Sequence, residues 1–111
     1  MGSAPIGDAT VVIPLYNGAG SIAETLDSIA AQTVQPARVI VIDDGSDDGG
    51  PSIVAQHPLG AELVEQPHVG VAVARNRGLA AAGTRWVTFL DQDDLWHPDK
   101  LARACQQLQL T

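Results

Sequence analysis

Strand-like and helix-like segments alternate along the whole of this chain, and the alternation limits the possible folds more than any other feature. Apolar runs at residues 10–17, 39–42, 61–65 and 85–90 predict four strands, each followed by a helical pattern. Such alternation is typical of a parallel α/β sheet with right-handed crossovers and helices on both faces. The third run suits an edge strand and the other three suit central positions, so we expect the strand order 3-2-1-4.

The helices are marked by residues at their ends. Ser21 followed by Glu24 predicts a capping box at the start of the first helix. Pro51 fits the opening turn of the second helix, and Gly83 fits the C-cap of the third. A last helix is expected to open at Pro98.

Acidic residues follow two of the predicted strands. Asp43 and Asp44 end the second strand, and Asp91, Asp93 and Asp94 follow the fourth. The carboxyl ends of parallel strands lie at one edge of a sheet, where ligands bind at the point at which strand order reverses. Carboxylates packed together repel one another, and a divalent cation relieves that repulsion. The sequence therefore predicts a metal-assisted site at this edge.

Composition narrows the class of protein. The 111 residues suffice for one small domain, which we take to be residues 1–111. The net charge of −7 argues against a general binder of nucleic-acid backbones, although a cation and a few arginines, such as Arg75 and Arg77, can offset the charge of a phosphorylated ligand. The single cysteine, Cys105, shares an apolar helical stripe with Leu101 and Leu108, which predicts a buried thiol in a reducing compartment.

The chain carries no sign of a membrane span or a signal peptide. No stretch approaches the roughly 20 apolar residues that a span needs, and the first ten residues lack the basic and apolar regions of a signal. We therefore expect a cytoplasmic protein, with a peripheral place at the membrane as the alternative for a longer form.

Four sequence strings together resemble the family 2 glycosyltransferases of the GT-A fold. They are VVIPLYNGAGSIAETLDSIAAQT, VIVIDDGSDDG, GVAVARNRGLAAA and FLDQDD, and the similarity covers residues 10–100 in unbroken order. The resemblance implies a three-layer, Rossmann-like α/β sheet of the nucleotide-diphospho-sugar transferase type. It also implies that this chain is a truncated form, the N-terminal donor-binding part of such a domain.

The resemblance assigns residues to a nucleotide-sugar donor. Pro14, Leu15 and Tyr16 correspond to the end of the family's first strand, and the Tyr16 ring is expected to lie against the base. Asp44 matches the position that accepts a hydrogen bond from the base, commonly uracil, so the expected donor is UDP-linked. Asp43 is expected to orient Asp44 or to face the ribose. A purely structural use of both acids, capping the turn that follows, stays open beside this interpretation.

The same resemblance assigns the metal and a basic contact. Asp91, Asp93 and Asp94 form the DXD-type element, which in the family binds Mg²⁺ or Mn²⁺ and the donor ribose. Asp94 is the expected metal ligand, Asp93 shares the ion or holds the ribose, and Asp91 supports them from behind. Arg75 matches a position that faces the nucleotide. Arg77 and the three histidines of the chain are expected to be surface or capping residues.

The implied reaction transfers a sugar from a nucleoside diphosphate sugar to a hydroxyl of an unidentified glycan, lipid or protein acceptor, with inversion. The family's catalytic base comes from a later segment, so we expect it beyond Thr111 and name no catalytic residue in this chain. Exposed strand edges then predict self-association.

A metal-dependent nucleotide-sugar binding module, or a pseudoenzyme, is the alternative. A phosphoacceptor receiver domain fits poorly, because such a domain needs its acid pair after the first strand, where this chain has Pro14 and Tyr16.

Overall fold

A four-stranded parallel sheet forms the centre of the molecule. The computed structural model describes residues 8–104. Along the chain the elements are β1 (Ala9–Leu15), α2 (Ile22–Ala30), β2 (Arg38–Asp43), α3 (Gly50–Gln56), β3 (Glu62–Glu65), α4 (Val71–Ala82) and β4 (Trp86–Phe89). The strand order is β3-β2-β1-β4, as the sequence predicts.

The central strand β1 aligns the other strands with one another. Its residues pair with β2 from Thr10 opposite Arg38 to Leu15 opposite Asp43, and with β4 on its other side. Every residue of β1 is buried, which agrees with its nearly continuous apolar sequence. Because all pairs are parallel, the carboxyl ends of β1, β2 and β4 lie at one edge of the sheet.

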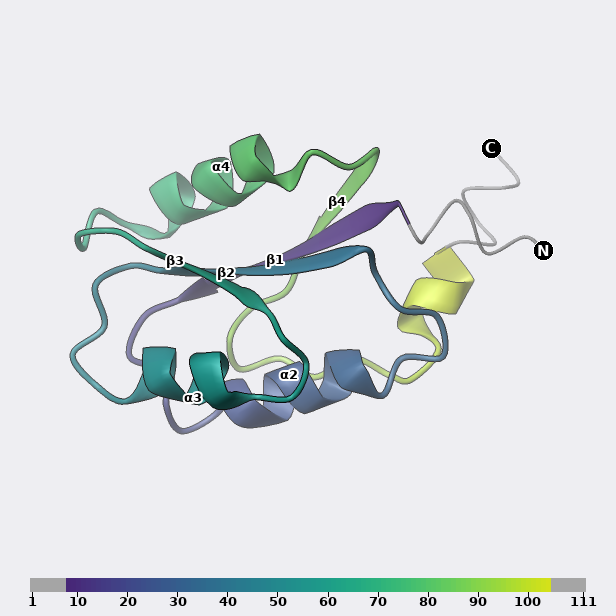
Figure 1. The fold of residues 1–111 in the computed structure, drawn as a ribbon, viewed down its shortest axis with the longest axis horizontal. Coiled ribbons are helices and arrows are strands. Elements are labelled where there is room, and N and C mark those ends of the chain that lie inside the picture. Colours follow the sequence, from purple (N-terminus) through teal and green to yellow (C-terminus); the bar gives the residue numbers. More distant parts are fainter. Residues whose placement is uncertain (1–7, 105–111) are drawn as a thin grey trace.

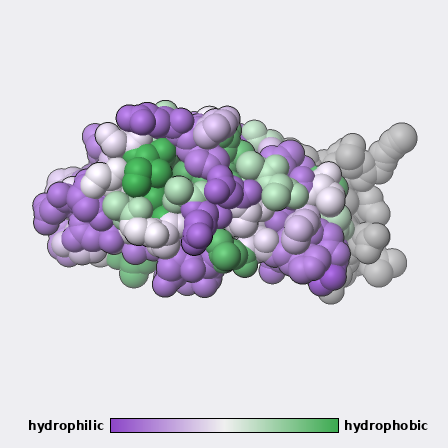
Figure 2. All heavy atoms as spheres, turned by 90° about the horizontal axis from the view of Figure 1, so that it is seen from below, coloured by the Kyte–Doolittle hydropathy of each residue, from purple (hydrophilic) through white to green (hydrophobic). Residues whose placement is uncertain are grey.

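Helices cover both faces of the sheet, with α2 and α3 below it and α4 above it (Figure 1). Alternating side chains of β1 serve the two faces: Val11 and Ile13 belong to the larger apolar cluster with Leu26 of α2, whereas Val12 packs with Ala74 of α4. From the side of α2 and α3, the surface is largely hydrophilic, with hydrophobic residues in small groups (Figure 2).

The helix α4 lies unusually close to the sheet because its buried face carries small residues. These are Ala74, Gly78 and Ala82. A methyl group at Gly78 would collide with the side chain of Val12, so only glycine permits this approach. The close packing fixes the start of α4, which borders the site described below.

Three sequence predictions need correction. Ser21 makes no side-chain cap bond to α2, because its hydroxyl donates instead to the Gln92 carbonyl. The fourth strand, expected in a central position, is an edge of the described sheet, and its Phe89 is 41% exposed. The last helix begins at residue 100, after a turn that contains Pro98.

Other predictions hold or cannot be assessed. Pro51 lies in the first turn of α3, and Gly83 ends α4 in the left-handed conformation, with φ of 66°. Leu101 is buried as expected. Cys105 and Leu108 of the predicted stripe lie outside the described residues. Among residues 8–104, no helix has the length and apolar character to cross a bilayer.

Candidate functional site

A cavity of about 320 Å³ opens at the carboxyl ends of the strands. It lies at the end of β1, which has β2 and β3 on one side and β4 on the other. The strand order reverses at this point, so this is the switch point of the sheet. The residues that line it come from the ends of β1, β2 and β4 and the start of α4: Pro14, Leu15, Tyr16, Asp44, Val71, Asp91, Gln92 and Asp93. The topology thus unites most of the residues predicted for the site.

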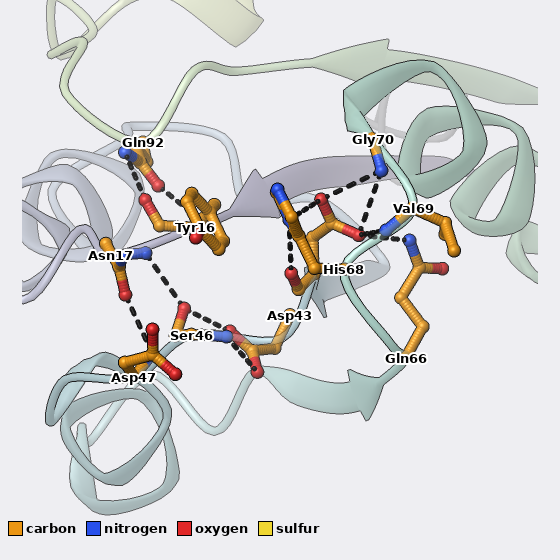
Figure 3. Close-up of polar contacts among 11 residues, drawn as sticks. Tyr16, Asn17, Asp43, Ser46, Asp47, Gln66, His68, Val69, Gly70 and Gln92 are labelled. Carbon is orange, nitrogen blue, oxygen red and sulfur yellow. Dashed lines mark hydrogen bonds and ion pairs between the residues drawn. The ribbon is translucent and has the colours of Figure 1, made fainter.

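Asp44 is the most firmly held side chain at this cavity. It is 3% exposed. Its Oδ1 accepts hydrogen bonds from Gln66 Nε2 at 2.9 Å and from the Val69 backbone N–H at 2.8 Å, and the Gly70 N–H lies 3.0 Å from Oδ2. His68 Nδ1 lies 3.0 Å from Oδ2 (Figure 3). One carboxylate therefore organises the whole segment that joins β3 to α4.

These contacts also set the acidity of Asp44. Burial acts to raise the pKa of Asp44, because a charge is poorly solvated inside a protein. The hydrogen bonds from Gln66, Val69 and Gly70, with the charge of His68, outweigh that effect and hold the pKa below its ordinary value. Asp44 is therefore a negatively charged acceptor at neutral pH.

The turn after Asp44 packs tightly against the same segment. Gly45 has φ of +81°, and a Cβ atom there would lie 2.8 Å from the backbone nitrogen of His68. Both the left-handed backbone and the close approach require glycine. The GS turn of the sequence is thus fitted to the segment that encloses Asp44.

Asp43 serves the turn on the other side. It is buried, and Ser46 donates to it from the backbone at 3.3 Å and from its hydroxyl at 2.5 Å. Asp48 accepts bonds from the backbone of Ala19 and Gly50. The structural use of Asp43 that the sequence left open, holding the turn that follows, is therefore present.

Tyr16 presents an aromatic ring at the cavity. It is 38% exposed, and the ring of His68 stacks on it with centroids 4.1 Å apart and planes inclined by 19° (Figure 3). Gln92 fixes the backbone of Tyr16 through two bonds, from the Tyr16 N–H to Oε1 at 2.7 Å and from Nε2 to the Tyr16 carbonyl at 3.0 Å. Gln92, from the segment after β4, therefore fixes the backbone that carries the Tyr16 ring.

The segment that carries Gln92 is itself tied to α2. The Thr25 hydroxyl lies 2.6 Å from the Gln92 carbonyl and 3.0 Å from that of Asp94, and the Ser21 hydroxyl reaches the Gln92 carbonyl at 3.1 Å. Residues 91–94 are therefore held mainly through their backbone rather than through their acidic side chains.

The acids after β4 are exposed, in contrast to Asp44. Arg75 Nη2 lies 3.2 Å from Asp91 Oδ1, and both side chains are about half exposed. Asp93 lines the cavity, whereas Asp94 is not among the lining residues. The structure thus brings Arg75, Asp91 and Asp93 together at the predicted site, whereas the Asp94 side chain, the expected metal ligand, lies outside the cavity lining.

Residues 8–104 contain no ready-made metal site, since no three His, Cys, Asp or Glu side chains gather as a set of ligands. Mg²⁺ and Mn²⁺ bound with a diphosphate need only one or two protein carboxylates, because phosphate oxygens and water complete the coordination shell. Asp91 and Asp93 on the cavity wall fit that requirement.

Sequence reasoning missed three residues at the site: Gln66, His68 and Gln92. Gln66 is buried and links Asp44 to Arg77 Nη1, which lies 3.4 Å from its Oε1. Gln92 lies within the acidic string FLDQDD, which marks its neighbourhood as functional. Its position in that string does not predict its contact with the Tyr16 backbone, 76 residues away. His68 gave no such signal.

Comparison with known proteins shows the family of this chain. The family model described as Glycosyl transferase family 2 matches residues 10–110. "Succinoglycan biosynthesis protein ExoO" of Rhizobium meliloti (strain 1021) is 36% identical over 102 residues, which are 90% of this chain and 29% of that protein.

Two solved structures share the fold closely. The mannosyltransferase PcManGT from Pyrobaculum calidifontis, in complex with GDP-Man and Mn²⁺, has a TM-score of 0.85 and 37% identity over 96% of this chain. S. aureus TarS 1-349 in complex with UDP-GlcNAc has a TM-score of 0.84 and 29% identity over 92%. The chain spans 33% and 31% of those two chains. With the family model matched over nearly its whole length, this chain belongs to glycosyl transferase family 2.

Proposed function

We propose that this chain binds a nucleoside diphosphate sugar together with Mg²⁺ or Mn²⁺, as the donor-binding part of a GT-A domain in an inverting glycosyltransferase. The observation that carries the proposal is that Tyr16, Asp44, Asp91 and Asp93 all line one cavity. An aromatic face beside a buried charged acceptor suits a nucleobase, and two exposed carboxylates suit a metal-bound diphosphate.

The base is assigned to the Tyr16 and Asp44 side of the cavity. A ring stacked on Tyr16 would have its edge toward Asp44, whose carboxylate accepts a hydrogen bond from a ring N–H. Uracil offers such an N–H, so a UDP-linked donor is the first choice. The similar structures hold UDP-GlcNAc in one case and GDP-Man in the other, and guanine also carries a ring N–H.

The diphosphate and metal are assigned to the Asp91 and Asp93 side. Asp93 would ligate the ion, with Asp91 and Arg75 beside it; the contact between Arg75 and Asp91 keeps the guanidinium at the cavity, where it can also meet a phosphate oxygen. When bound, the ion supplies stabilisation of the negative charge that grows on the departing diphosphate. The role of Asp91 is to hold Arg75 and the acid-bearing segment in place.

Transfer with inversion requires a base that removes the proton of the acceptor hydroxyl. Every acid that lines the cavity is assigned above to donor binding. We therefore place the catalytic base and the residues that bind the acceptor outside residues 8–104. The short share of the similar chains that this one covers supports that placement. The same facts favour the second candidate, a nucleotide-sugar binding module without turnover.

Titration calorimetry tests the proposal. UDP, GDP, CDP and ADP are titrated into the chain with and without Mn²⁺, and a turnover assay with UDP-sugars is run on the chain and on a longer form. We expect UDP or GDP to bind with marked metal dependence. Absence of binding by all four nucleotides would refute the proposal, and binding without turnover in either form would select the module.

Self-association belongs to the same proposal. The strand β4 pairs on one side with β1, and its Phe89 is 41% exposed, so the edge can pair with a second copy. Light scattering over a wide range of concentration should show dimers or larger species, and a constant monomer mass would argue against this association.

A further inference from the structure

His68 makes the two contacts with the site that the proposed function assigns to a nucleobase. Its ring stacks on Tyr16 at 4.1 Å between centroids, and its Nδ1 lies 3.0 Å from Asp44 Oδ2 (Figure 3). An imidazole and a pyrimidine base share two features: a flat ring that can stack, and a ring nitrogen that can carry a proton and donate a hydrogen bond. In the nucleotide-free protein, His68 thus occupies the position proposed for the base.

The carboxylate of Asp44 has little room for a further donor. A carboxylate offers about four lone-pair sites. Gln66, Val69 and Gly70 donate to Oδ1, and Oδ2 receives Gly70 and His68. A base that donates to Asp44 must therefore take the place of one of these groups.

His68 is the donor that can leave at the lowest cost. Two of the others are backbone N–H groups of Val69 and Gly70, and Gln66 is buried. The His68 side chain is 58% exposed and needs only a rotation about its own bonds to leave both Asp44 and Tyr16. The remaining donors keep the segment in place when it does.

We propose that His68 is an autoinhibitory contact, which occupies the base position in the nucleotide-free protein and is displaced by the base that binds. The inference rests on the proposed function. A base that stacks on Tyr16 and presents a ring N–H to Asp44 replaces the stacking and the carboxylate contact of His68, whose Nδ1 also lies 3.1 Å from the Asp44 carbonyl. Uracil and guanine do so, whereas cytosine and adenine present a bare acceptor nitrogen at the equivalent ring position. Asp44 thereby favours nucleotides with a ring N–H, whereas His68 competes with any base that stacks on Tyr16.

The test compares UDP affinity, measured by calorimetry with Mn²⁺, for the unchanged chain, His68→Ala and His97→Ala. His97 is the matched control, because it is also exposed and its Nδ1 also contacts an aspartate, Asp99 at 2.6 Å. Removal of the competing ring should tighten UDP binding by about three- to tenfold, the size expected for one aromatic contact. His97→Ala should leave the affinity unchanged.

A second variant and a second signal separate competition from a general change in the segment. His68→Phe keeps a ring on Tyr16 without the N–H, so its UDP affinity should lie between those of the unchanged chain and His68→Ala. In NMR spectra, the carbon-bound ring protons of His68 should move toward solvent-like shifts as UDP saturates the chain.

Equal or weaker UDP binding by His68→Ala, or His68 ring signals that stay in place at saturation, would overturn the inference while the proposed function stands. If none of the variants nor the unchanged chain binds UDP or GDP, the proposed function and this inference both fail.

Discussion

Two sets of acids follow the strands that flank β1, and the structure gives them opposite surroundings. Asp44 is 3% exposed and receives hydrogen bonds from several donors. Asp91 is 57% exposed and contacts Arg75, while the Asp93 carboxylate has no hydrogen bond within residues 8–104. The same sequence pattern, an apolar strand that ends in acids, thus yields one carboxylate fixed by the fold and two exposed carboxylates, of which Asp91 contacts Arg75.

The difference comes from what packs against each strand end. The segment between β3 and α4 directs its N–H groups at Asp44. The segment after β4 is instead held through backbone carbonyls by Thr25 and Ser21, so its acids are not consumed by the fold. The carboxylate of the first region is therefore fixed by the fold, whereas the acids of the second region contribute little to it.

The largest expected effect comes from Asp44→Ala. Loss of the carboxylate leaves several N–H donors without their acceptor, and we expect the free energy of unfolding to fall by about 2–4 kcal/mol and nucleotide binding to be lost. Urea denaturation and calorimetry measure the two effects. Asp47→Ala is the control, since Asp47 is exposed and takes part through its backbone N–H. Equal stability of the two variants would remove the contrast between the regions.

Asp93→Asn should act on binding without touching stability. We expect the Mn²⁺-dependent part of UDP affinity to fall at least about tenfold, because a neutral amide is a poor ligand for a hard cation, while the urea midpoint stays unchanged. Asp94→Asn is the matched variant and should retain metal dependence. Should Asp94→Asn prove to be the damaging change, the ion is held outside the cavity wall described above.

Gln92→Ala tests whether the two regions are coupled. Its amide joins the Tyr16 backbone to the acidic segment, so its loss should lower stability by about 1–2 kcal/mol and weaken UDP binding about threefold through a less well-positioned Tyr16. Gln35→Ala is the control, because the Gln35 amide bonds carbonyls at the end of α2. If both variants bind UDP like the unchanged chain, Gln92 has no positioning role.

The smallest effect concerns acid stability. The pKa of Asp44 is lower in the folded chain than its unfolded value near 3.9, so its contribution to stability is complete above about pH 4 and is lost as the pH falls through the lower folded value. Asp44→Asn removes this contribution at all pH values. The stability difference between the unchanged chain and Asp44→Asn should therefore shrink as the pH falls below about 4, and a difference that grows over that range would contradict the assignment.

Much of this arrangement is predictable from the sequence, because the information is local. Alternating apolar runs predict the parallel sheet and its order, and the acids at strand ends then converge by topology alone. What the sequence does not show are contacts between distant segments: Gln92 with Tyr16, and His68 with Asp44. Ser21 is an example: the local pattern predicts a helix cap, but the Ser21 hydroxyl donates instead to the Gln92 carbonyl, 71 residues away.

The central claim is that Tyr16, Asp44, Asp91 and Asp93 form one site for a metal-bound nucleotide. A crystal structure of the chain with UDP and Mn²⁺ tests it most directly. The account predicts the base on Tyr16 with a ring N–H at Asp44, the ion at Asp93, and His68 moved aside. A nucleotide bound elsewhere, or an ion that contacts neither Asp91 nor Asp93, would contradict it.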